Sequence, residues 1–198
     1  MDNSSQLHPT FQHSTYLFRR KLLKLVGGAF HVYADDGSLL LYGKQRAFKL
    51  REDMSIFTDE SESETLIRIR TPQIIDIGAT YGVLDVHADE MVGAIRRKAL
   101  KSMIRDEYVF IDAGGQEVGL MTEQSMMGAM ASRFINLIPQ RYRAVTTGGE
   151  EAATIKQHFN PLILKYTLSV PEADPLIDRR LLIAACILLC AIEGRQQN

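Results

Sequence analysis

The sequence lacks the charge excess and the cysteine content that mark several common classes of protein. Its 198 residues include 23 Lys and Arg against 24 Asp and Glu, which gives a net charge of −1 at pH 7. A nucleic-acid-binding domain usually carries a positive excess, so this balance disfavours that class. The two cysteines, Cys186 and Cys190, are too few for a metal site and do not have the C-x-x-C spacing of redox motifs. We interpret them as reduced thiols in the protein core.

Long hydrophobic runs are also missing. The segment from Leu181 to Ile192 has no charged, hydroxyl or amide side chain. As a helix its twelve residues would cover only about 18 Å, against a hydrocarbon core of about 30 Å. The first ten residues, MDNSSQLHPT, are polar and do not resemble a signal peptide. We therefore expect no transmembrane span and a cytoplasmic protein that is at most peripheral to a membrane.

Catalytic motifs are absent from the sequence as well. There is no Gly-rich phosphate loop, zinc-protease motif, nucleophile elbow or EF-hand loop. The five histidines are scattered along the chain. The acidic cluster of Asp59, Glu60, Glu62 and Glu64 lacks the glycine and spaced carbonyl ligands of a calcium loop, so we interpret it as a solvated hairpin tip. We expect no catalytic residue, no metal and no cofactor.

The apolar run itself predicts a buried helix from about Pro175 to Glu193. Asp174 can cap its first amides, Pro175 suits the first helical position, and Gly194 can close the last turn. A helix that is apolar on every side is surrounded by protein. Glu193 would lie at the negative end of the helix dipole, so we expect an arginine partner for it near the barrel mouth.

The rest of the chain reads as antiparallel sheet. Polar and glycine-containing turns separate about ten to twelve short segments with alternating apolar residues. In one of them Ala153, Ile155 and Phe159 are predicted to face inward. A sheet this large can close around the apolar helix, and a lumen wide enough for a helix needs more than about eight strands. A sandwich with the helix on one side is the alternative. Residues 125–135 predict one further, amphipathic helix.

Three longer segments resemble the LURP-one-related family, which belongs with Tubby C-terminal domains and phospholipid scramblases. They are Lys44–Phe57, Arg96–Asp106, and the C-terminal stretch from Asp178 to Arg195. The resemblance implies a closed barrel of twelve antiparallel strands around a central hydrophobic helix, with residues 15–198 as one domain after a flexible N-terminus of residues 1–14. Tubby domains bind phosphoinositides through basic side chains, but no reaction is attached to this family.

Basic residues form the remaining candidate site. An anionic headgroup is attracted by Lys and Arg, and Arg offers a planar fork to phosphate oxygens. The leading group comprises Arg96, Arg97, Lys98, Lys101 and Arg105. Two further groups are Arg19, Arg20, Lys21 and Lys24, and Lys44, Arg46, Lys49 and Arg51.

These residues predict a non-enzymatic binding module that recognises anionic phospholipid headgroups or a protein partner at a membrane surface. One alternative is a small-molecule carrier or enzyme with a pocket at a barrel mouth. It is disfavoured because the helix is expected to fill the lumen. The other is a nucleic-acid-associated regulator, which the net charge disfavours.

Overall fold

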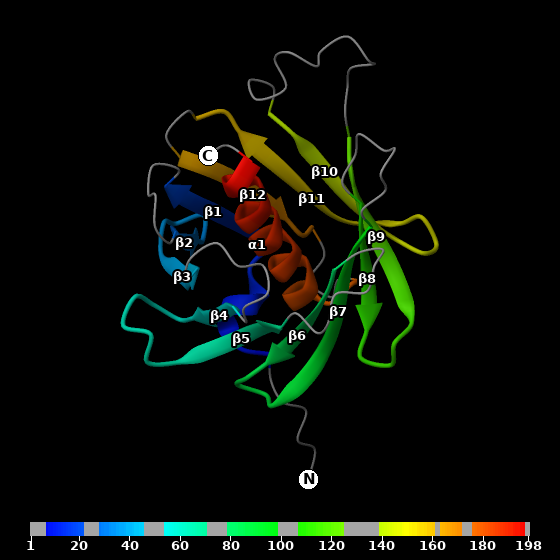
Figure 1. Ribbon diagram of the computed structural model, residues 1–198, viewed down its shortest axis with the longest axis horizontal. Helices are drawn as coiled ribbons and strands as arrows, with labels where there is room; N and C mark the ends of the chain where they lie inside the picture. The colour runs from blue at the N-terminus through cyan, green and yellow to red at the C-terminus, as the bar shows by residue number, and fades with distance from the viewer. Residues whose placement is uncertain are drawn as a thin grey trace.

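Twelve antiparallel strands form a closed barrel around one helix (Figure 1). The structure is a computed structural model, which describes residues 7–21, 28–45, 54–70, 79–98, 107–124, 139–160, 163–171 and 176–196. Each strand pairs with the next one along the chain, and β1 pairs with β12 to close the ring. The strands are β1 (Thr15–Lys21), β2 (Gly28–Tyr33), β3 (Leu39–Gln45), β4 (Met54–Phe57), β5 (Thr65–Arg70), β6 (Thr80–Asp85), β7 (Glu90–Lys98), β8 (Glu107–Asp112), β9 (Glu117–Glu123), β10 (Arg141–Thr146), β11 (Glu151–His158) and β12 (Ile163–Ser169). The predicted closed barrel is therefore confirmed, and the sandwich alternative is wrong.

Alternation along the strands places one set of side chains in the lumen. In β12 the side chains of Leu164, Tyr166 and Leu168 are buried, while Lys165 and Thr167 between them are only partly covered. Successive side chains of a strand point to opposite faces of the sheet, so this pattern separates an apolar lining from a polar outer surface. Large aromatic side chains of the lining, such as Tyr16 and Tyr166, fill the space between sheet and helix.

The single α-helix of the described residues, α1 (Arg179–Gln196), runs through the middle of the barrel (Figure 1). Its side chains from Leu181 to Ala191 are all buried, and both cysteines within it are free thiols. The chain therefore uses its apolar run as a core helix, as the sequence predicted. The predicted amphipathic helix at 125–135 lies outside the described residues.

The predicted helix boundaries were wrong at both ends. The helix begins at Arg179 rather than at Pro175, because the carboxylate of Asp178 accepts a hydrogen bond from the Arg180 amide at 2.8 Å and so caps it. At the other end the helix continues to Gln196, so Gly194 lies within it and does not terminate it. The helix is thus shifted toward the C-terminus relative to the prediction.

The C-terminal half of α1 is contacted by a buried strand residue. The guanidinium of Arg20, on β1, donates a hydrogen bond to the carbonyl of Cys190 at 2.5 Å and one to the carbonyl of Ala191 at 3.4 Å. The C-terminal part of a helix carries partial negative charge, so a buried cation near it is favourable. The side chain of Glu193, for which an arginine partner was predicted, lies outside the described residues.

Packing on the barrel begins before residue 15. Residues Pro9–Gln12 form a short 3-10 helix, η1, and its Phe11 is fully buried in the hydrophobic core. Part of the segment predicted as a flexible N-terminus, residues 1–14, therefore contributes to the core of the barrel domain.

One other prediction about side-chain direction was wrong. Phe159 was expected to face inward with Ala153 and Ile155, but it is 59% exposed. The strand β11 ends at His158, so Phe159 belongs to the turn that leads into β12 and does not follow the alternation.

Because α1 forms the centre of the core, single changes in it are expected to unfold the protein. Leu188 is fully buried, and its replacement by Ala should lower the free energy of unfolding by about 2–5 kcal/mol. Leu188→Asp would place an uncompensated charge in the lumen and should prevent folding. Urea denaturation followed by circular dichroism measures both. A cooperative transition in Leu188→Asp at the wild-type urea concentration would contradict the central role of α1.

Candidate anion-binding face

The leading basic group of the sequence is divided by the structure. Arg96, Arg97 and Lys98 end β7, where alternation turns Arg96 and Lys98 outward and Arg97 toward the lining side. Arg96 forms an ion pair with Glu117, and Lys98 forms one with Glu107 at 2.6 Å. Lys101 and Arg105 lie outside the described residues. Among the described members, the two outward cations are thus already partnered by carboxylates of neighbouring strands.

The second group, Arg19, Arg20, Lys21 and Lys24, is divided in the same way. Arg20 is buried beneath the helix end, and burial lowers its pKa. Arg19 points outward, with its guanidinium 5.1 Å from the centroid of the Tyr33 ring. The side chain of Lys21 and all of Lys24 lie outside the described residues. Only Arg19 is therefore placed where a soluble or membrane-bound anion can reach it.

In the third group the described cation is paired as well. Lys44 lies 3.4 Å from Glu62, in the turn between β4 and β5, while Arg46, Lys49 and Arg51 lie outside the described residues. The same turn confirms the interpretation of the acidic cluster as a hairpin tip. Two of its other carboxylates lie near histidines, since Glu60 contacts His31 at 2.7 Å and Glu64 lies 3.8 Å from His87.

A different cluster of cations covers the outer surface of four adjacent strands. Arg19 on β1 lies directly opposite Lys165 on β12, and Lys165 lies opposite His158 on β11. Lys156, two residues before His158, lies opposite Arg141 on β10. We call these residues the basic face: Arg19, Arg141, Lys156, His158 and Lys165.

Neighbours of like charge in the basic face carry an energetic cost. Directly opposed residues of an antiparallel pair have Cβ atoms about 4.5–5.5 Å apart, and like charges at that distance are destabilising. The effect is visible at His158, whose pKa is lowered by partial burial and then by the positive charges of Lys165 and Lys156. An anion bound across the strands would relieve this repulsion.

Two carboxylates in the neighbourhood of the strands of the basic face, Glu60 and Glu151, are engaged by other residues. On the β2 side Glu60 contacts His31, and on the β10 side Glu151 accepts a hydrogen bond from Arg143 at 2.5 Å. Within the described parts of the chain, Arg19, Arg141, Lys156 and Lys165 form no ion pair with a carboxylate. This arrangement suits an anionic ligand, which supplies the missing negative charge.

The sequence contained part of this signal. Alternation already placed Lys165 outside β12 and Lys156 and His158 outside β11. It did not show that these strands adjoin each other and β1, because that follows from barrel closure and register. Runs of consecutive basic residues drew attention instead to β7, where alternation splits them.

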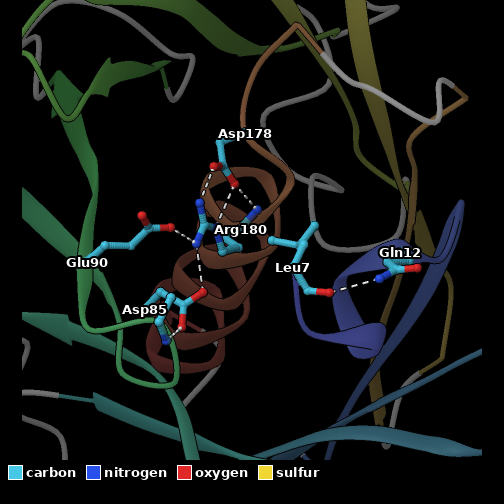
Figure 2. A network of polar contacts seen from close by, with 7 residues as sticks. Leu7, Gln12, Asp85, Glu90, Asp178 and Arg180 are labelled. Carbon is cyan, nitrogen blue, oxygen red and sulfur yellow. Dashed lines mark hydrogen bonds and ion pairs between the residues drawn. The ribbon is translucent and has the colours of Figure 1, made fainter. Parts of the chain in front are cut away.

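A second polar cluster lies at the opposite end of the barrel, around Arg180 at the beginning of α1 (Figure 2). Its guanidinium donates hydrogen bonds to Asp178 and Asp85 at 2.7 Å each and to Glu90 at 2.5 Å. The side chains of Arg180 and Asp85 are only 10% and 3% exposed. Asp85 also accepts a hydrogen bond from the Ala88 amide, in the turn between β6 and β7.

The Arg180 cluster is a structural tie and not a site for a ligand. Burial alone would lower the pKa of Arg180, but hydrogen bonds to Asp178, Asp85 and Glu90 outweigh that effect and raise it. The cation therefore stays charged and joins the start of the helix to the β6–β7 hairpin. Its neighbour Arg179 donates to the His13 carbonyl at 2.5 Å, which ties the helix to the segment before β1.

Removing the cation of this tie is expected to be costly. Arg180→Gln leaves the Asp85 carboxylate buried without its partner, and loss of one member of a buried pair costs about 3–5 kcal/mol. The matched control is Arg143→Gln, which breaks a pair whose side chains are both 42% exposed and should cost less than about 1 kcal/mol. Urea denaturation compares the two variants. Equal, small losses of stability would show that the Arg180 cluster does not tie the helix to the barrel.

Comparison with known proteins adds no family to these observations. No model of a protein family matches the chain, and no curated protein matches it. Among the described residues, no helix is long and apolar enough to cross a membrane. Membership of the LURP-one-related family therefore stays a prediction that rests on the three quoted sequence segments.

Proposed function

We propose that the protein is a non-enzymatic binding module that recognises anionic phospholipid headgroups at a membrane surface through the basic face. The observation that carries this proposal is the row of cations across β10, β11, β12 and β1 that has no carboxylate partner among the described residues. Each Lys or Arg close to an anionic membrane contributes about 1 kcal/mol of attraction. The resemblance to Tubby-related proteins points in the same direction.

The filled lumen supports a binding function on the outer surface. Side chains of α1 from Leu181 to Ala191 are buried against the lining of the barrel. A carrier or enzyme of barrel type needs an internal cavity for its ligand. The basic face instead lies on the outside of the sheet, where an anionic surface can approach it.

Vesicle co-sedimentation tests the proposal and separates the two basic regions. The wild-type protein should bind vesicles containing phosphatidylglycerol but not vesicles of phosphatidylcholine alone. The variant Arg19→Gln/Lys156→Gln/Lys165→Gln should bind about a hundredfold more weakly, since three cations at about 1 kcal/mol each are lost. The matched control is Arg96→Gln/Lys98→Gln, which removes cations already paired with carboxylates and should change affinity little.

The reverse order of these two variants would move the site to β7. No binding of the wild-type protein to anionic vesicles would contradict the proposed function. In that case an acidic protein would remain as the candidate ligand of the basic face. Salt provides a second check. The affinity for anionic vesicles should fall as ionic strength rises, since the screening length of exposed charges is about 10 Å at 0.1 M but about 3 Å at 1 M.

Lipid binding is expected to strengthen as the pH falls. The pKa of His158 is lowered in the free protein, so its ring is mostly neutral at pH 7 and gains a positive charge below that pH. A bound phosphate group stabilises the charged ring, and affinity should therefore rise as the pH falls below about 7. His158→Gln should remove most of this rise, while His87→Gln, in the β6–β7 turn, should keep it. A rise of equal size in both variants would exclude His158 as its source.

A further inference from the structure

One large hydrophobic side chain is exposed directly beside the basic face. Phe159, 59% exposed, follows His158 at the end of β11. The turn that carries it is held by Asn160, whose side-chain oxygen accepts a hydrogen bond from the Ile163 amide at 3.0 Å. Exposing an aromatic side chain to water is unfavourable. Within the described structure the Phe159 ring stays largely exposed beside the cations of the basic face.

The position of Phe159 along the barrel axis follows from the strand register. Leu164, which begins β12 together with Ile163, lies opposite Arg20. Arg20 in turn contacts the Cys190 carbonyl at the last turns of α1. Phe159 and the basic face therefore lie toward the end of the barrel where α1 finishes, which we call the basic end.

The opposite end, where α1 begins, carries charge of the other sign. In an up-and-down barrel alternate turns meet at one end, and the Arg180 contacts with Asp85 and Glu90 place the β6–β7 turn at this one. We call it the acidic end. Its turns contain several carboxylates and no Lys or Arg; they span residues 34–38, 58–64, 86–89, 113–116 and 147–150.

The other exposed hydrophobic side chains have acidic surroundings. Among the described residues, Leu176 and Met91 are the remaining large ones that are exposed, at 55% and 51%. Leu176 lies two residues before Asp178, and Met91 follows Glu90 at the start of β7. Both lie toward the acidic end. Phe159 alone among these three combines an exposed apolar side chain with neighbouring unpaired cations.

We infer that the protein docks on an anionic bilayer in one orientation, with Phe159 inserted between lipids, the basic face on the headgroups and the acidic end directed away. This inference rests on the proposed function and adds the orientation and the apolar anchor. Peripheral membrane proteins combine apolar side chains that enter about 5–10 Å of the interface with cations that attract anionic lipid. In the reversed orientation the carboxylates of the acidic end would face the anionic headgroups, and the like charges would repel each other.

The absence of tryptophan from the sequence allows a direct test. In the Phe159→Trp variant the only indole should shift its emission to shorter wavelength on vesicles containing phosphatidylglycerol, and lipids brominated on the acyl chain should quench it. The matched control, Leu176→Trp, places the indole at the acidic end, where emission should stay that of an indole in water. Thermal melting should show that both variants fold like the wild type, because both positions are exposed.

Affinity gives a second measurement. Phe159→Ser should weaken vesicle binding about tenfold, since the loss of apolar burial at the interface is partial. Leu176→Ser should leave affinity unchanged. The salt dependence of binding should be the same in both variants, because neither changes a charge.

Three results would overturn the inference. Vesicle binding that leaves the indole of Phe159→Trp in water, or that shifts Leu176→Trp instead, would contradict the orientation while leaving the proposed function standing. A shift of Phe159→Trp with a short oligonucleotide but not with vesicles would replace lipid by nucleic acid as the ligand. Absence of binding to anionic vesicles would remove both the proposed function and the inference. Inorganic phosphate alone should not shift the emission, because it offers no apolar phase.

Discussion

The burial of α1 inside the barrel is the constraint on which the rest of the structure depends. Six Leu and Ile side chains between Leu181 and Leu189 are at most 1% exposed, and at about 1.5–3 kcal/mol each their burial is comparable to a typical net stability of about 5–15 kcal/mol. A helix enclosed in this way cannot rely on water for its terminal amides and carbonyls. Asp178 caps the first amides, and Arg20 holds the C-terminal half of the helix through the Cys190 carbonyl. The burial of Arg20 is therefore explained by its contact with the helix.

The sequence predicted the elements better than their limits, for an identifiable physical reason. Alternation within a strand and an apolar run are local properties, so the strands and the core helix were predicted correctly. The choice between Asp174 and Asp178 as the helix cap is not local. Both are good caps, and Asp178 caps the helix where Arg180 can also reach Asp85 on β6 and Glu90 on β7. The start of the helix is thus set by contacts with strands that are distant in the sequence. A short segment of sequence does not show those contacts.

The candidate site shows the same limit more strongly. In a strand, consecutive residues point to opposite faces, so a basic run such as Arg96 to Lys98 cannot form one surface. Cations that do form one surface come from strands far apart in the sequence, as Arg19 and Lys165 do. Their adjacency arises because the first and last strands pair to close the barrel. Such a site becomes visible only when strand order and register are known.

A filled lumen leaves the outer surface and the two ends for interactions, and the charges there are not evenly distributed. The net charge of −1 conceals an uneven distribution along the barrel axis within the described residues, with carboxylates in the turns where α1 begins and cations without carboxylate partners toward the end where it finishes. A separation of this kind produces a torque in the field of a charged surface before any contact is made. At the anionic surface proposed above, it would bring the basic end in first, and that end carries the exposed side chain of Phe159. The distribution of charge thus supports the proposed orientation, which the net charge alone does not predict.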